Sequence, residues 1–84
     1  SYTDKESLAL FLLQQRMSEV VSVTQREAGT FEGSFGPEHP GYRWRVRLSP
    51  LVRELLRAEV SVTWRDRGRQ YEVSAVGLAK GGLR

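Results

Sequence analysis

The stretch that decides the fold reads Tyr42-Arg-Trp-Arg-Val-Arg-Leu48. Apolar and basic residues alternate along it without interruption, and this period of two is typical of a β-strand with one buried and one exposed face. The buried face would carry Tyr42, Trp44, Val46 and Leu48, and the exposed face Arg43, Arg45 and Arg47. The sequence therefore predicts a half-buried strand over residues 42–48.

Two more alternating stretches follow, over residues 58–64 and 70–76, and between them lies the turn sequence Arg65-Asp-Arg-Gly68. Because glycine accepts the positive φ of a tight turn, we expect these two stretches to form a β-hairpin. Pro50 is expected to end the first strand, since proline donates no hydrogen bond to the ladder. Residues 51–56 would then form a connecting turn or helical bend, and the tail 77–84 is expected to be frayed.

A helix is predicted upstream, over about residues 3–24. It would begin at Thr3-Asp-Lys-Glu6, which has the capping-box pattern. Successive residues of a helix are rotated by about 100°, and this rotation would bring a set of mostly apolar residues onto one side of the helix. That stripe is suited to packing on the sheet. The stripe contains Leu10, Leu13, Met17, Val20, Val21 and Thr24. Residues 25–41 are expected to form an ordered loop or a short edge strand with two phenylalanines.

These elements predict an α+β fold, with one long N-terminal helix packed on an antiparallel β-sheet. The 84 residues are expected to form a single domain, and the absence of cysteine excludes a small disulfide-stapled protein. No apolar run approaches the length of a membrane span. The net charge of +3 divides unevenly, because residues 1–40 carry −3 and residues 41–84 carry +6. Such a split is compatible with an acidic partner such as nucleic acid, with attraction between the halves, or with head-to-tail docking of subunits.

Residue types for catalysis and metal binding are sparse in the chain. The single histidine, His39, lies in a turn sequence, and no cysteine or second histidine could complete a metal site with it. No serine has the surroundings of a nucleophile elbow, and the glycines of residues 29–41 do not join a strand to a helix as a phosphate-binding loop does. We therefore expect no catalytic, metal or cofactor-binding residues, and no enzyme activity.

Arginines form the most basic surface that the sequence predicts, a possible face for a polyanion or an acidic partner. It would contain Arg43, Arg45 and Arg47, joined by Arg65, Arg67 and Arg69 at the hairpin turn. Guanidinium groups along a strand could follow phosphates, with aromatic rings for base stacking. However, alternation places the aromatic residues on the opposite face of the strand. We therefore expect a solvated face, with Glu59 and Glu72 of neighbouring strands as its ionic partners.

The predicted helix is apolar on a second side of its first turns. In so short a chain few elements remain to cover both sides, so we expect this second side to contact a partner protein. The predicted interface contains Leu8, Phe11, Leu12, Gln15 and Glu19.

A family resemblance rests on four segments: residues 8–19 on the helix, Gly41-Tyr-Arg-Trp-Arg-Val46 on the first strand, residues 56–64, and Gly68-Arg69. In this order they resemble the type IV pilin-like proteins, and more narrowly the I-type minor pseudopilins of type II secretion systems. The resemblance implies a pilin-like fold without enzyme activity. It also implies that a leader, a methylated N-terminal phenylalanine and a membrane-spanning half-helix precede Ser1.

By this resemblance the chain is the periplasmic domain of a bacterial protein anchored in the inner membrane. Its partners would be J-type and K-type minor pseudopilins, in a complex at the pseudopilus tip that initiates growth. Leu8, Phe11 and Leu12 would then contact the helices of neighbouring subunits. The distinction between a secretion pseudopilin and a type IV minor pilin stays open. The alternative function is that of a minor pilin or small basic module that binds nucleic acid through Arg43, Arg45 and Arg47.

Overall fold

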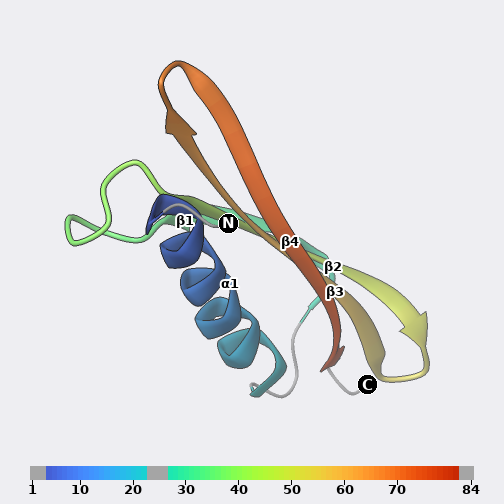
Figure 1. Cartoon of the computed structure of the whole chain (residues 1–84). Helices are drawn as coiled ribbons and strands as arrows, with labels where there is room; N and C mark the ends of the chain where they lie inside the picture. Colours follow the sequence, from blue (N-terminus) through green and yellow to red (C-terminus); the bar gives the residue numbers. More distant parts are fainter. Residues whose placement is uncertain (1–3, 23–26, 82–84) are drawn as a thin grey trace.

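The computed structural model describes residues 4–22 and 27–81. One helix, α1 (Asp4–Ser22), precedes four strands, β1 (Gly29–Ser34), β2 (Arg43–Val52), β3 (Leu55–Asp66) and β4 (Arg69–Lys80). The strands form one antiparallel sheet in the order β1-β2-β3-β4, and α1 packs on one face of it (Figure 1). The predicted α+β arrangement of a helix on an antiparallel sheet is therefore confirmed. We call the face that α1 covers the inner face and the opposite one the outer face.

The helix occupies most of the range predicted for it. Asp4 and Glu6 lie in its first turn, where their negative charges favour the positive end of the helix dipole. Thr3 and Thr24, the predicted cap and the last residue of the predicted stripe, lie outside the described residues. Over residues 4–22 and 27–81, no helix is both long and apolar enough to cross a membrane.

The prediction that Pro50 ends the first strand is wrong. β2 continues to Val52, and the chain reverses at Arg53 and Glu54 instead of through a bend over residues 51–56. The register between β2 and β3 shifts between Pro50 and Val52, which leaves the intervening residue unpaired. This bulge lets the ladder resume beyond a residue that has no N–H group to donate.

The prediction that the tail 77–84 is frayed is also wrong as far as residue 80. β4 continues to Lys80, which pairs with Leu55. The predicted hairpin is confirmed and is longer at both ends than the sequence indicated. Its turn is formed by Arg67 and Gly68, with φ angles of 54° and 78°, as a two-residue type I′ turn requires. Upstream, residues 29–34 form the edge strand β1, which is one of the two structures considered for residues 25–41.

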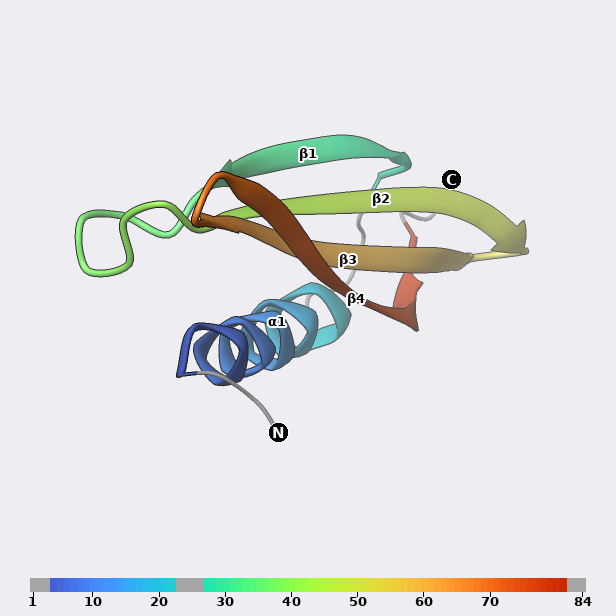
Figure 2. The same cartoon turned by 45° about the horizontal axis from the view of Figure 1, so that its top comes forward.

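The core lies between α1 and the inner face of β2, β3 and β4 (Figure 2). Alternate residues of the strands point into it, as the period of two predicted, and Val60 and Val62 are fully buried. From the strands the core takes Tyr42, Val46, Leu48, Leu56, Ala58, Val60, Val62, Trp64 and Ala79. Trp44, which was predicted to share this face, is only half-buried, because α1 lies over β3 and β4.

The predicted stripe is confirmed only in part, because Leu13 and Val20 are buried as predicted but share the buried side of the helix with residues outside the stripe. The buried residues of the helix are Ala9, Leu12, Leu13 and Val20. In the predicted stripe, Leu10 and Met17 are half-buried and Val21 is 41% exposed. The first turns are apolar on both sides, so the rotation of the helix is set by the sheet beneath it and not by its own periodicity.

Polar contacts fix the first turn of α1 to the tip of the hairpin. The Tyr42 hydroxyl donates to the Lys5 carbonyl oxygen at 2.9 Å, and the Lys5 Nζ donates to the Asp66 carboxylate at 2.7 Å. Burial raises the pKa of Tyr42, and the hydrogen bond from Lys5 lowers the pKa of Asp66. The Trp64 ring stacks between those of Tyr42 and Tyr71, with centroid distances of 6.0 and 5.6 Å. The helix and the hairpin are therefore joined at this end of the sheet by both packing and hydrogen bonds.

Candidate interaction surfaces

The side of α1 that points away from the sheet centres on Phe11, whose side chain is 54% exposed. Around it lies a shallow depression of about 420 Å³, and we call this surface the helix ridge. The ridge contains Phe11, Gln14, Gln15, Ser18 and Glu19. No other described element covers it (Figure 2). Three of the five predicted interface residues, Phe11, Gln15 and Glu19, are therefore brought together on an open surface.

The other two predicted interface residues lie differently. Leu12 is 2% exposed and belongs to the core, which corrects the prediction for this residue. Leu8 is half-buried and packs against the same core. One step of about 100° around the helix separates Phe11 from Leu12, and this rotation is enough to direct Leu12 onto the sheet.

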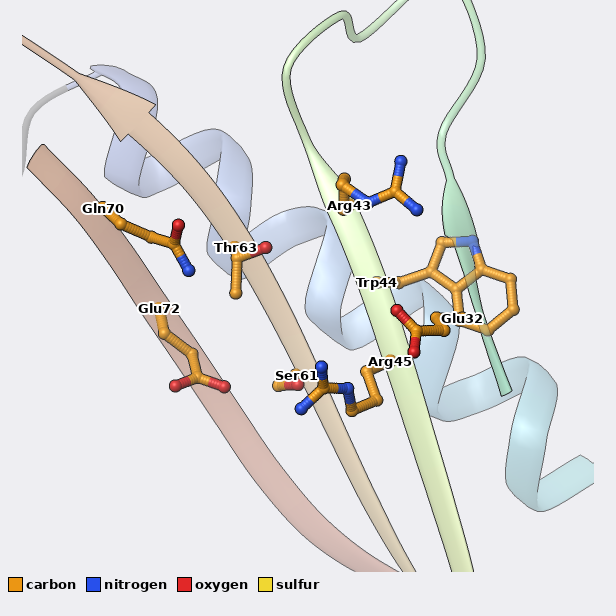
Figure 3. Close-up of a pocket in the computed structure, with 8 residues that line it drawn as sticks. All are labelled: Glu32, Arg43, Trp44, Arg45, Ser61, Thr63, Gln70 and Glu72. Atoms are coloured by element: carbon orange, nitrogen blue, oxygen red, sulfur yellow. The ribbon is translucent and has the colours of Figure 1, made fainter. Parts of the chain in front are cut away.

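The outer face of the sheet carries Arg43, Arg45 and Arg47 in exposed positions, as predicted. Figure 3 shows Arg43 and Arg45 on β2 with Glu32 on the β1 side and Glu72 on the β4 side. These residues line a depression of about 300 Å³ together with Trp44, Ser61, Thr63 and Gln70. The depression is therefore polar and contains charges of both signs.

Carboxylates are interleaved with the arginines over the whole outer face. The Glu59 carboxylate lies 3.7 Å from Arg47 and 3.4 Å from Arg57, so Glu59 is an ionic partner of the arginines as predicted. The strand register places Glu32 beside Arg45. Arg43 and Arg45 form no ion pair within the described part of the chain. A polyanion on this face would meet these two free guanidinium groups but also the repulsion of the neighbouring carboxylates.

The six predicted arginines do not form one patch. Arg65 lies on the outer face, where its Nη2 donates to the Gly68 carbonyl oxygen at 2.9 Å. Arg67 lies in the turn itself, and Arg69 pairs with Asp66 and lies on the inner side of the sheet. A turn of two residues reverses the chain so that positions 65 and 69 fall on opposite faces, which corrects the prediction that they reinforce the row on β2.

A third surface, which the sequence did not predict, lies between α1 and the β1 side of the sheet. We call it the aromatic groove. The Arg16 guanidinium lies over the rings of Trp44 and Phe35, at 4.4 and 5.4 Å from their centroids, and its Nη1 is 3.0 Å from the Glu19 carboxylate. The groove has a volume of about 210 Å³ and is lined by Arg16, Glu19, Val20, Phe31, Trp44 and Val46.

One sequence signal could have indicated this groove. Gly33 pairs with Trp44, and a small residue opposite a large one is typical of a ring lying flat across a neighbouring strand. A Cβ atom at position 33 would lie 2.8 Å from Trp44 Cζ2, and the Trp44 Nε1 donates to the Ser34 carbonyl oxygen at 3.1 Å. The indole therefore requires glycine at this position.

Gly33→Ala is expected to destabilise the protein by about 1 kcal/mol, because the added methyl group displaces the indole. At an ordinary strand position the same substitution stabilises by up to about 1 kcal/mol, so the sign of the effect is informative. Urea unfolding would measure it. In a Trp44→Leu background the substitution is expected to become neutral or stabilising. Stabilisation in the natural background would contradict the close contact.

His39 has a structural part in the loop between β1 and β2. Its backbone N–H donates to the Gly36 carbonyl oxygen, and its carbonyl oxygen accepts from the Tyr42 N–H. No group of three or more His, Cys, Asp or Glu side chains that could hold a metal ion occurs among residues 4–22 and 27–81. Comparisons of the chain with protein-family profiles, curated proteins and solved structures found no match.

Proposed function

We propose that this chain is the globular domain of a minor pseudopilin of a type II protein secretion system. In this proposal it is a structural subunit without enzyme activity, the periplasmic part of a protein anchored in the bacterial inner membrane. It assembles with J-type and K-type minor pseudopilins at the pseudopilus tip and initiates growth of the pseudopilus. The pilin-like identity is part of the proposal, and the arrangement of an N-terminal helix on an antiparallel sheet supports it.

The observation that carries the proposal is the exposure of Phe11 on the helix ridge. An aromatic side chain that is 54% exposed on the uncovered side of a helix is suited to packing against a second helix. Gln15 and Glu19 follow at intervals of four residues along the same ridge and could supply the polar rim of such a contact. The opposite side of α1 is occupied by the protein's own core, whereas the ridge side is open to a neighbouring subunit.

Phe11→Glu is expected to leave the domain folded and to weaken the complex with J-type and K-type partners at least about tenfold. Glutamate replaces an exposed aromatic side chain, so the isolated fold loses little, whereas a helix–helix contact would have to bury the new charge. Copurification and quantitative binding of the full-length protein with these partners would measure the effect, with far-UV circular dichroism as the check on folding.

Val52→Glu is a matched control for this experiment. Val52 is 57% exposed at the far end of β2, so the substitution introduces the same charge at a similarly exposed apolar residue away from the ridge. It is expected to leave the complex intact. Unaltered partner binding by Phe11→Glu, or a lowered thermal midpoint with normal binding, would contradict the assignment.

The encoded residues upstream of Ser1 are a second test of the proposal. A short basic leader, a cleavage motif similar to Gly-Phe-Thr-Leu and a following apolar run would establish a prepilin. Their absence would favour the alternative that the domain binds nucleic acid.

The alternative function uses the outer face of the sheet. It is favoured by Arg43 and Arg45, which form no ion pair with other described residues. It is opposed by the carboxylates of Glu32, Glu59 and Glu72 on the same face. The Trp44 ring is also already in contact with Arg16 of α1, which leaves it less available for base stacking. The geometry therefore supports the pseudopilin proposal better.

A further inference from the structure

β4 has no partner strand on one of its two sides among the described residues. It is an edge strand of 12 residues, twice the length of β1 at the opposite edge, which has 6. Figure 2 shows β3 along one edge of β4 and no strand along its other edge. Unpaired backbone groups along such a strand are a template for pairing with another chain.

The hairpin turn decides which backbone groups of β4 are free. In a two-residue type I′ hairpin, the residues that flank the turn, here Asp66 and Arg69, form a closely bonded pair. Bonding then alternates along the strand, so the odd-numbered residues of β4 bond to β3. The even-numbered residues from 70 to 80 direct their N–H and C=O groups to the free edge, and their side chains lie on the outer face.

Two of these even-numbered residues are large, apolar and exposed. Val76 and Leu78 are 57% and 54% exposed, on a face that is otherwise mostly charged or polar. The register places Val76 opposite Glu59 and Leu78 opposite Arg57, so neither side chain has an apolar neighbour across the strand pair. A strand added at the free edge could supply one.

The charges on β4 match those of a second copy in one particular register. In antiparallel pairing about a two-fold axis at Val76, Val76 faces the partner's Val76 and Ser74 faces the partner's Leu78. Glu72 then faces the partner's Lys80, and symmetry produces this pair of opposite charges twice. A two-fold axis at residue 74 or 75 would instead place Glu72 opposite an apolar side chain. Of these three registers, only the one centred on Val76 places Glu72 opposite a basic residue.

An apolar groove lies beside the same edge, between α1 and β4. It is lined mainly by Leu10, Leu13, Met17, Val21 and Ala75, with a volume of about 240 Å³. The helix is in close contact with β4, because a Cβ at Gly77 would lie 3.1 Å from the Met17 sulfur. Because α1 contacts β3 and β4, a symmetric copy paired at this edge would bring its own α1 to the same side of the joined sheet, next to this groove.

From these observations we propose that the domain forms a symmetric dimer in which the β4 strands of two copies pair antiparallel about Val76. The two sheets become one continuous sheet, the Val76 and Leu78 side chains cluster across the axis, and the two α1 helices cover the apolar grooves. The contact uses the β4 side of α1, so Phe11 stays outside it. The two-fold axis also makes the two α1 helices antiparallel. The dimer is therefore proposed for the domain by itself, and not for two copies anchored side by side in one membrane.

Reversal of the paired charges tests both the dimer and its register. Glu72→Lys alone or Lys80→Glu alone places like charges opposite each other at two symmetric sites. Each is expected to weaken the dimer about tenfold, while the double variant restores the wild-type dissociation constant to within about twofold. Sedimentation equilibrium of the 84-residue chain would measure this constant. Glu38→Lys, in the exposed turn after β1, is the matched control and is expected to have no effect.

Amide hydrogen exchange provides a second readout that does not depend on the variants. In the dimer, the amides of residues 74, 76 and 78 are expected to become protected as the protein concentration rises. The amides of residues 73, 75 and 77 bond to β3 and are expected to be protected at every concentration. A chain that stays monomeric to about 1 mM with residues 74, 76 and 78 unprotected would overturn the proposal. So would a double charge swap that fails to restore pairing.

Discussion

Leu12→Ala is expected to lower the free energy of unfolding by about 3 kcal/mol. Leu12 is 2% exposed and is among the largest fully buried side chains of the core. Removing it takes away its burial and leaves a cavity between α1 and the sheet that the surrounding strands can fill only in part. Urea unfolding followed by circular dichroism would measure the change.

The neighbouring substitution Phe11→Ala is the matched control for Leu12→Ala. Phenylalanine is the larger side chain, but at 54% exposure its truncation is expected to cost less than about 1 kcal/mol. Sequence alone does not distinguish the two positions, because both belong to the second apolar side of the helix. Equal costs, or a larger cost for Phe11→Ala, would contradict the observed rotation of α1 and return Leu12 to the predicted partner interface.

Trp64→Ala is expected to cost about 4 kcal/mol, within the range for truncation of a buried tryptophan. Trp64 is 6% exposed and stacks between Tyr42 and Tyr71. Its ring therefore joins β2, β3 and β4 where the first turn of α1 is attached to the hairpin. Without it, the hairpin tip loses its packing as well as the buried area of the indole. The measurement is again urea unfolding followed by far-UV circular dichroism.

Trp44→Ala provides the comparison within the same sheet. Trp44 is half-buried, since α1 lies over β3 and β4, and its ring contacts Arg16 at the surface. We expect this substitution to cost about 1–2 kcal/mol, less than half the cost of Trp64→Ala. An equal or larger cost for Trp44→Ala would show that the centre of the core lies nearer to β1 than the structure places it.

The alternation along the strands allowed their faces to be predicted, because a period of two is a local property of extended backbone. It placed Val46 and Leu48 in the core and the arginines of β2 outside. The ends of the strands could not be predicted in the same way. Hydrogen bonds from a neighbouring strand carry β2 past Pro50 and hold β4 in register as far as Lys80.

The candidate surfaces likewise include one that local sequence patterns predict in part and one that they do not predict. The polar helix residues Gln15 and Glu19 could be placed on an exposed side from amphipathic periodicity, which is encoded within a few turns. The aromatic groove joins Arg16 of α1 to Phe31 of β1 and Trp44 of β2, and no local pattern relates these positions. Such a site is formed only when segments distant in sequence pack together.

The sequence by itself determined the class of fold, the hairpin and the inward or outward direction of most strand residues, because each depends on interactions between near neighbours. Only the tertiary structure decided how α1 is rotated on the sheet, and therefore that Leu12 is core and Phe11 is surface. It also decided which strands lie at the two edges of the sheet among the described residues. Both depend on contacts that are made between segments far apart in the chain.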